Sequence, residues 1–225
     1  MVHPSKRPPY CKLHLGEQEP VRCKYFEIGL GRTATRSVWQ AACTLGLNAM
    51  HGTGGCVKCL DSALDAIKNG ETDCDLYRCY EYVGHFPNLH WEKLADERPD
   101  AKFILTTRPT KLWLRSARAK FGKTHLRDDP RRARMLHMKM FGTLRPTEEE
   151  LLRGYTDHLK AVMNRFHDEP DRLLIVDVFT MPDELLWSKL TRFFGLTEDM
   201  SIARFPDRYR PIKRFNPRNA PPGAE

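Results

Sequence analysis

The segment Lys24-Tyr-Phe-Glu-Ile-Gly-Leu-Gly-Arg-Thr-Ala-Thr-Arg-Ser37 decides the fold class that this chain can adopt. Its first half is an apolar run that predicts a buried strand, and this strand leads into a turn that contains glycine. Its second half is rich in hydroxyl groups and opens a helix predicted over Thr35–Leu45. At such a junction, free backbone N–H groups and the positive end of a helix dipole point toward the same space. The segment therefore predicts an anion-binding loop.

Two further apolar runs, at 101–107 and 173–178, also predict buried strands. Helical periodicity and capping signals lie around them, and the predicted helices cover 57–68, 89–97, 109–121, 130–141, 147–167 and 182–194. Apolar strands that alternate with helices are typical of a parallel sheet covered on both faces. We therefore expect an α/β fold like that of P-loop NTPases, a three-layer sandwich with a central parallel sheet flanked by helices.

Length and composition favour one globular domain over 1–225. The chain has 225 residues, of which 40% are hydrophobic and 29% charged, and it contains no linker, repeat or low-complexity block. Residues 1–20 and 215–225 are rich in proline and charge, and we expect them to be flexible. No apolar run is long enough to span a bilayer and no secretory leader opens the chain, so we expect a cytoplasmic protein.

The positive charge of the chain is concentrated in one region. The formal net charge is +8, and residues 108–145 alone hold twelve lysines and arginines against two aspartates. Such a field attracts polyanions, which include nucleic acids, anionic membranes and multiply phosphorylated small molecules. The alternative for most of these residues is a solvated helix face.

The loop after the first strand departs from the phosphate loop of nucleotide kinases in an informative way. Gly29 matches the first glycine of that motif, but Ala34 replaces the second glycine, Thr35 the lysine and Arg36 the hydroxyl residue that binds Mg²⁺. The basic residue has moved into the loop, to Arg32. The segment therefore predicts an anion cradle that works without a metal ion.

The run Arg32-Thr-Ala-Thr-Arg-Ser37 resembles the 5′-phosphosulfate-binding loop of sulfotransferases that use 3′-phosphoadenosine 5′-phosphosulfate (PAPS). In that family a basic residue, two small residues and a threonine precede threonine or arginine. Ala34 departs from the pattern, because the family usually has glycine there, and a positive φ at this position would strain an alanine. The resemblance implies donor contacts from Gly31, Arg32, Thr33, Ala34, Thr35, Arg36 and Ser37.

A second segment resembles the same family. Arg108 follows the predicted strand at 101–107, and Ser116 comes eight residues later. The family binds the 3′-phosphate of its donor with an arginine and a serine at this spacing, and an arginine suits a phosphate because it is always charged and bidentate. The resemblance covers about residues 25–116 and, more weakly, 173–206; residues 118–170 match no pattern of the family.

The resemblance implies transfer of a sulfuryl group, which requires charge at the leaving oxygen and a base for the acceptor. We assign the leaving-group charge to Arg32, helped by other residues of its loop. His85 is the first candidate for the base, because it precedes an aromatic-proline pair where related enzymes carry an acid. Glu81 is the runner-up, one helical turn earlier in spacing, while His51 and His90 remain alternatives.

The seven cysteines do not select one role. Cys56 and Cys59, together with Cys74 and Cys79, present pairs that could ligate zinc, with His51 nearby. A disulfide is an alternative for an exported protein. Buried free thiols are the default in a reducing compartment, so we expect no metal.

The sequence thus predicts a sulfotransferase that moves the sulfuryl group of PAPS to a hydroxyl or amine and releases 3′-phosphoadenosine 5′-phosphate (PAP). The acceptor is a small molecule or a glycan. The basic region at 118–145 indicates an anionic acceptor, whereas a pocket for a flat small molecule is equally consistent with the aromatic residues Phe86, Trp91, Phe121 and Phe141. The sequence decides neither between O- and N-sulfation nor the oligomeric state.

Other interpretations stay open. A kinase of the P-loop type would bind ATP with Mg²⁺, although the lysine of its motif is missing. A basic module without catalysis would bind nucleic acid with steep salt dependence, although no RNA- or DNA-binding signature is present and we expect no such partner. A degenerate sulfotransferase fold, kept for protein contacts, would bind the donor poorly.

Overall fold

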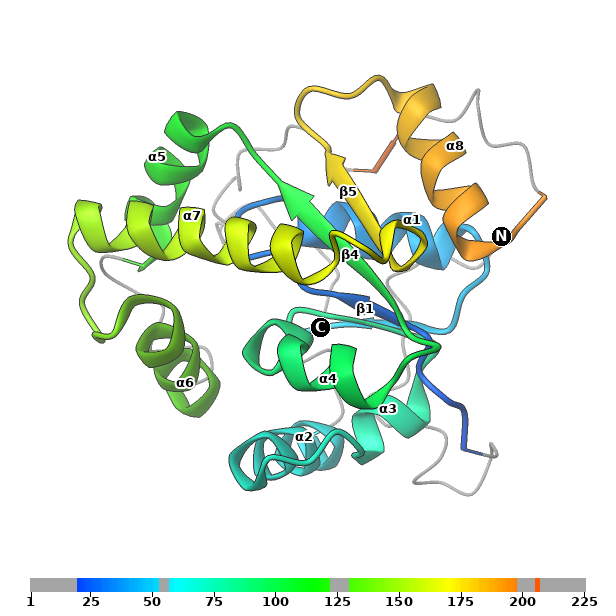
Figure 1. Ribbon diagram of the computed structural model, residues 1–225, viewed down its shortest axis with the longest axis horizontal. Coiled ribbons are helices and arrows are strands. Elements are labelled where there is room, and N and C mark those ends of the chain that lie inside the picture. The colour runs from blue at the N-terminus through cyan, green and yellow to red at the C-terminus, as the bar shows by residue number, and fades with distance from the viewer. Residues whose placement is uncertain (1–19, 53–56, 122–129, 198–204, 207–225) are drawn as a thin grey trace, which may run out of the picture.

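The computed structural model describes residues 20–52, 57–121, 130–197 and 205–206. Within these residues, five strands form one parallel sheet in the order β2-β3-β1-β4-β5 (Figure 1). The strands are β1 (Tyr25–Glu27), β2 (Ala49–His51), β3 (Tyr82–Gly84), β4 (Lys102–Thr107) and β5 (Leu173–Asp177). The predicted α/β fold with a central parallel sheet is confirmed.

Helices cover both faces of this sheet. They are α1 (Thr35–Thr44), α2 (Val57–Asn69), α3 (Asp75–Cys79), α4 (Trp91–Glu97), α5 (Thr110–Phe121), α6 (Pro130–Phe141), α7 (Glu148–Arg165) and α8 (Asp183–Phe194), with short 3₁₀ turns at η2 (Pro87–Leu89) and η3 (Pro170–Arg172). Every helix predicted from periodicity is present, with ends that shift by a few residues. The prediction missed α3 and the strands β2 and β3, because elements this short carry no readable periodicity.

Alternation along the strands assigns side chains to the two faces. Phe103 and Leu105 of β4 pack on the side of α2, α3 and α4, whereas Ile104 packs against α1 and α8. Both faces are therefore apolar, as a parallel sheet in the middle of three layers requires.

The chain order places a ligand-binding position beside β1. From β1 the chain crosses to the edge strand β2, returns to form β3 between β2 and β1, and then adds β4 and β5 on the other side of β1. The loops that follow β1 and β4 therefore diverge at the edge where all five strands end, which we call the carboxyl edge. Open α/β sheets bind their ligands at such a switch point.

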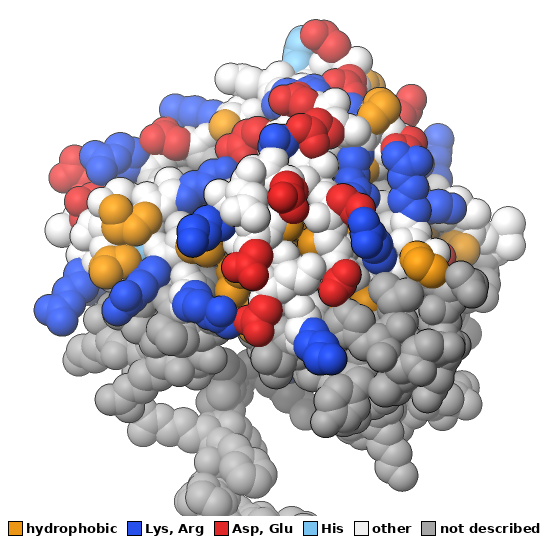
Figure 2. Space-filling model, turned by 90° about the horizontal axis from the view of Figure 1, so that it is seen from below, with side chains coloured by type: hydrophobic (Ala, Val, Ile, Leu, Met, Phe, Trp, Pro, Cys, Tyr) orange, Lys and Arg blue, Asp and Glu red, His pale blue; other side chains and the backbone are white. Residues whose placement is uncertain are grey.

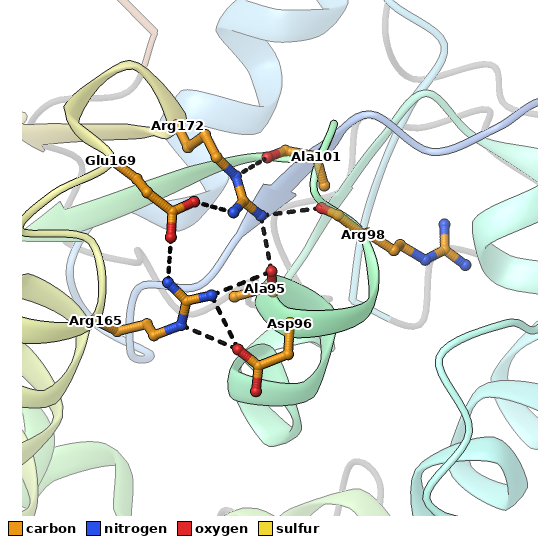
Figure 3. A network of polar contacts seen from close by, with 7 residues as sticks. All are labelled: Ala95, Asp96, Arg98, Ala101, Arg165, Glu169 and Arg172. Carbon is orange, nitrogen blue, oxygen red and sulfur yellow. Dashed lines mark hydrogen bonds and ion pairs between the residues drawn. The ribbon is translucent and has the colours of Figure 1, made fainter.

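An arginine network closes the opposite, amino edge of the sheet (Figure 3). Arg165 of α7 donates to Asp96 Oδ1 at 2.9 and 3.1 Å and pairs with Glu169. Arg172 pairs with the same Glu169 and donates to three backbone carbonyls at 2.9–3.1 Å, those of Ala95, Arg98 and Ala101. These contacts tie α4, α7 and the start of β4 together.

Local capping signals agree with the structure at α7 and α8. A capping box opens α7, since Glu150 N–H donates to Thr147 Oγ1 at 3.2 Å and Thr147 N–H donates to Glu150 Oε2 at 2.7 Å. Gly195 ends α8 with a φ of 70°, as a left-handed cap requires. In the described part of the chain, no helix combines the length and apolar character needed to cross a bilayer.

The basic excess of the sequence does not form a single-sign surface on the face in Figure 2. Over the described residues in this view, lysine and arginine side chains alternate with aspartate and glutamate (Figure 2). Ion pairs at the surface of the described residues include Arg131 with Asp61, and Lys139 with Glu92. On this face, the solvated interpretation of the basic residues is the better one.

Candidate active site

The loop between β1 and α1 has a strained backbone. Arg32 has a φ of 80° and Ala34 a φ of 69°, both in the left-handed region that favours glycine. Ala34 is the N-cap of α1 and gives no side-chain cap, so the first turn of α1 keeps donors for a ligand. The expected strain at Ala34 is thus present, at a cost of about 1 kcal/mol relative to glycine.

A buried polar chain supports the loop from below. Glu27 Oε1, at the end of β1, accepts from Gly29 N–H at 2.9 Å and lies 2.9 Å from Thr106 Oγ1. Thr106 Oγ1 lies 2.6 Å from Thr33 Oγ1, which lies 2.6 Å from the carbonyl of Leu30. Position 29 must be glycine, because an added Cβ would lie 1.9 Å from Thr106 Oγ1.

Sequence reasoning missed Glu27 and Thr106. The available signal was a carboxylate inside an apolar strand two residues before a glycine turn, where a buried acid needs a partner. The sequence predicted that Thr33 contacts the sulfuryl donor PAPS. In the structure its side chain is fully buried, and its hydroxyl belongs to the buried polar chain that supports the loop.

The guanidinium of Arg32 is half-buried at the same loop. Its Nε donates to Ser116 Oγ of α5 at 2.8 Å, and it forms no ion pair with any carboxylate of the described residues. Burial lowers the pKa of Arg32, because the charged form loses hydration. A half-buried cation without a carboxylate partner is a binding position for an anion.

Arg108, directly after β4, reaches the same loop. Its Nη1 donates to the carbonyl of Arg32 at 3.2 Å, and its guanidinium carbon lies 4.0 Å from the ring centroid of Phe179. Arg32, Arg108 and Ser116, predicted from separate motifs, therefore lie in one cluster at the carboxyl edge.

Tyr155 of α7 fixes the backbone at Arg108. Its hydroxyl donates to the carbonyl of Arg108 at 2.8 Å and accepts from the N–H of the same residue at 2.9 Å. Burial raises the pKa of Tyr155, so the hydroxyl keeps its proton. Its ring stacks on Trp113 at 4.2 Å, and the indole N–H of Trp113 donates to the carbonyl of Gly31 at 3.1 Å. Tyr155 lies in the region 118–170, which matched no pattern of the family, and Phe179 lies in the weakly matching region 173–206 but was not singled out there.

The remaining loop residues present different groups. Thr35 and Ser37 are buried in the first turn of α1, whereas Arg36 is exposed. The hydroxyl of Thr35 lies 2.8 Å from His51 Nε2. Gly31 and Ala34 are half-buried and offer only backbone groups to a ligand.

Two histidines lie beside the loop. His51 ends β2 and His85 follows β3, and their rings stack with centroids 5.1 Å apart and an interplanar angle of 3°. His85 has a φ of 79°, a left-handed conformation that turns the chain directly after the strand. Both candidates for the base therefore lie at the carboxyl edge.

The structure separates Glu81 and His90 from this cluster. Glu81 precedes β3 at the amino edge, where its Oε2 accepts from Asn48 N–H at 3.0 Å. The expected helical spacing between Glu81 and His85 was wrong, because a strand runs between them and places them at opposite edges of the sheet. His90 stacks on Tyr77, and its Nε2 lies 3.1 Å from the Tyr77 hydroxyl. Burial lowers its pKa to about 3, so this imidazole is neutral.

A groove of about 380 Å³ lies between α4, α6 and α7. Trp91 and Phe141, two of the aromatic residues expected to line a pocket, border it together with His158. Nε2 of His158 donates to the carbonyl of Ile28 at 2.9 Å, and burial lowers the pKa of this imidazole to about 4. The groove thus adjoins the strand that leads into the loop.

The cysteines of the described residues do not gather into a metal site. Cys23 and Cys74 are buried thiols, and burial raises the pKa of Cys74 to about 11. The sulfurs of Cys59 and Cys79 lie 3.7 Å apart, while Cys56 falls outside the described residues. No group of three or more histidine, cysteine or acidic side chains able to hold a metal ion occurs in the described ranges.

Comparison with known proteins identifies the family of this chain. A family model described as a sulfotransferase domain matches residues 24–209. Among solved structures, the crystal structure of a sulfotransferase from Alicyclobacillus acidocaldarius is similar at 15% sequence identity with a TM-score of 0.49, over 84% of this chain and 88% of that chain. No curated protein sequence matches the chain. Because the family model spans most of the chain, from before β1 to beyond α8, the protein belongs to the sulfotransferase-domain family.

Proposed function

We propose that this protein transfers the sulfuryl group of PAPS to a hydroxyl or amine of a small-molecule or glycan acceptor and releases PAP. The observation that carries the proposal is Arg32, a half-buried guanidinium in the loop after β1 that has no carboxylate partner among the described residues. An enzyme with an anionic co-substrate needs such a charge, because bound ligand supplies the missing countercharge.

The donor PAPS would contact both parts of the cluster, the loop at Arg32 and the pair of Arg108 and Ser116. The loop at Arg32 and the first turn of α1 would hold the 5′-phosphosulfate, where backbone N–H groups and the helix dipole favour an anion. Arg108 and Ser116 would hold the 3′-phosphate. The hydrogen bond between Arg32 Nε and Ser116 Oγ supports this assignment, because it connects the loop at Arg32 directly to the residue that would hold the 3′-phosphate.

The reaction would be an in-line displacement at sulfur. The acceptor oxygen or nitrogen forms a bond to sulfur while the bond from sulfur to the 5′-phosphate oxygen breaks. Negative charge then develops on that oxygen, where Arg32 would stabilise it. The proton of the acceptor would go to the imidazole of His85, with His51 as the alternative, since both follow strands at the carboxyl edge.

The acceptor is proposed only by class. Its hydroxyl or amine must reach the space between the loop and the stacked histidines. The groove beside His158, whose imidazole contacts the carbonyl of Ile28 just before the loop, is lined by Lys139, Arg153, Glu92 and Asp157 as well as aromatic residues. Groups of both charge signs favour a polar acceptor over a purely apolar one.

Thermal unfolding with nucleotides tests the donor site. PAP at about 100 times its Kd is expected to stabilise the protein by about 2.7 kcal/mol, whereas AMP and ATP with Mg²⁺ are expected to stabilise it much less. Arg32→Ala and Arg108→Ala should abolish the effect of PAP. Arg192→Ala, at an exposed position of α8, is the matched control and should retain it.

The other interpretations predict different outcomes of the same experiment. Stabilisation by ATP with Mg²⁺ but not by PAP would replace the sulfotransferase proposal with a kinase. If no nucleotide stabilises the protein and RNA or DNA binds to it in a salt-dependent way, a nucleic-acid-binding module is favoured. Once PAP binding is established, turnover of PAPS with panels of phenols, amines and glycans identifies the acceptor class.

A further inference from the structure

A histidine contacts the first helical residue after the anion-binding loop. Nε2 of His51, at the end of β2, lies 2.8 Å from Oγ1 of Thr35, the first residue of α1. Thr35 follows Ala34, an N-cap whose side chain gives no hydrogen bond to the helix, so Thr35 belongs to the turn whose backbone donors remain for an anion. The contact therefore connects β2 to the proposed PAPS site.

The imidazole of His51 is held on several sides. Its ring stacks on His85 with centroids 5.1 Å apart and an interplanar angle of 3°, and its centroid lies 6.0 Å from that of the Trp39 ring. An added Cβ on Gly84 would lie 3.1 Å from His51 Cδ2, so the ring also packs closely against this backbone. Neighbours on these sides restrict the rotation of the ring, and the restricted ring keeps Nε2 directed at Thr35.

The contact between Nε2 and Oγ1 uses one proton, and either residue can supply it. If the hydroxyl of Thr35 donates, it has no proton left for a ligand, and its lone pairs repel a bound anion. If Nε2–H of His51 donates, the hydroxyl proton of Thr35 stays available to an anionic oxygen. The neutral Nε2–H tautomer and the imidazolium both supply this donor, so the second arrangement does not depend on the charge of the ring. A site for an anion therefore favours donation from His51.

We propose that His51 is a positioning residue of the PAPS site: its Nε2–H donates to Thr35 Oγ1, and this bond directs the hydroxyl proton of Thr35 toward the bound anion. The hydrogen bonds then run in one direction, from His51 through Thr35 to the anion, and such a chain strengthens its last member. Because Nε2 of His51 already holds a proton, this atom does not take the proton of the acceptor, and His85 remains the first candidate for the base. The identity of the anion rests on the proposed function, whereas the direction of the bond from His51 to Thr35 does not.

Nitrogen NMR measures the direction of this bond. In protein labelled with ¹⁵N in histidine, the chemical shift of His51 Nε2 at pH 7 should be that of a nitrogen that carries a proton, both without ligand and with PAP. The resonance is assigned by its loss in His51→Gln or, should that variant not fold, by through-space contacts between the rings of His51 and Trp39. An unprotonated Nε2 in either state would overturn the proposal, because Thr35 would then be the donor.

Variants of His51 test the positioning role through PAP affinity, measured by calorimetric titration. His51→Phe keeps a ring that can stack on His85 but removes the donor, so it should weaken PAP binding about fivefold. His51→Gln supplies an amide N–H in place of Nε2–H and should bind PAP within about twofold of the wild type. Thr35→Val should weaken binding about tenfold, and His51→Phe added to it should cause no further loss, since both changes act through one hydroxyl.

The opposite direction of donation predicts different affinities. If Thr35 donates to His51 in the wild type, His51→Phe frees the hydroxyl proton and should leave PAP binding unchanged or make it tighter, which would overturn the proposal. Full additivity of the losses in the double variant would also overturn it, because His51 would then not act through Thr35. If PAP does not bind the wild type, the proposed function fails, while the protonation of His51 Nε2 still decides the direction of the bond.

Discussion

The two edges of the sheet use arginine in opposite ways. At the amino edge, Arg165 and Arg172 share Glu169, and Arg165 also binds Asp96, so each cation has a carboxylate partner (Figure 3). At the carboxyl edge, Arg32 is half-buried, and among the described residues its guanidinium donates only to a serine hydroxyl. The pKa values follow this difference: the hydrogen bond with Glu169 raises that of Arg165, and burial lowers that of Arg32.

This difference separates a structural charge from a functional one. A paired arginine in a network of satisfied acceptors contributes to stability, and its removal leaves those acceptors without donors. A half-buried arginine without a carboxylate partner is a net cost to the folded protein until an anion binds. Removal of charge should therefore have opposite effects at the two edges.

The largest expected effect is on ligand binding at the carboxyl edge. Arg32→Met removes the charge but keeps much of the side-chain length, and it should weaken PAP binding by about 100-fold, since a charged hydrogen-bonded contact contributes roughly 1.5–3 kcal/mol. Calorimetric titration measures this change. The free energy of unfolding without ligand, measured in urea, should stay equal or rise. A variant that binds PAP normally, or that is clearly less stable, would contradict the comparison.

The reverse pattern is expected at the amino edge. Arg172→Met removes the donor of three carbonyls and one partner of Glu169, so the free energy of unfolding should fall by roughly 2–3 kcal/mol. PAP affinity should not change. Arg22→Met, which removes an exposed pair with Asp100, is the matched control and should cost less than about 1 kcal/mol. Equal losses in both variants would mean that burial in the network is irrelevant.

A smaller effect is expected from the strained loop that carries Arg32. Ala34→Gly relieves the left-handed φ of 69° and should raise the free energy of unfolding by about 1 kcal/mol while PAP still binds. Ala161→Gly, at an exposed position inside α7, should instead lower it by about 1 kcal/mol. If both substitutions destabilise the protein in chemical denaturation, the backbone at Ala34 is not strained.

The smallest expected effect is a pH dependence at the amino edge. Hydrogen bonds from Arg165 and then Arg172 lower the pKa of Glu169, so this carboxyl stabilises the fold at pH values above its unfolded pKa of about 4.3. That contribution is lost as the pH falls through the lower, folded pKa. Glu169→Gln should therefore reduce Tm at pH 7 and match the wild type near the acid limit of the folded state. Glu71→Gln, at an exposed position, should show no such convergence.

The sequence predicted the long elements and three of the residues that cluster at the carboxyl edge. β4, β5 and the longer helices have enough residues to display periodicity, and Arg32, Arg108 and Ser116 were placed by motif and spacing. The short strands β2 and β3 were missed because their hydrogen bonds come from neighbours far along the chain. The relation of Glu81 to His85 was missed for the same reason. The strand β3 runs between these two residues, so Glu81 lies at the amino edge and His85 at the carboxyl edge.

The sequence by itself determined that this chain forms a parallel α/β sheet with a glycine-containing, hydroxyl-rich loop after its first strand, because periodicity and turn chemistry are local properties. Only the tertiary structure decided which charges are compensated. Arg165 lies beside Asp96 and Glu169, while Arg32 lies beside Ser116 and above a carboxyl buried by β1 and β4. Whether a charged side chain stabilises the fold or is available to a ligand depends on its burial and on its partners. Packing supplies both, and the neighbouring residues in the sequence do not reveal them.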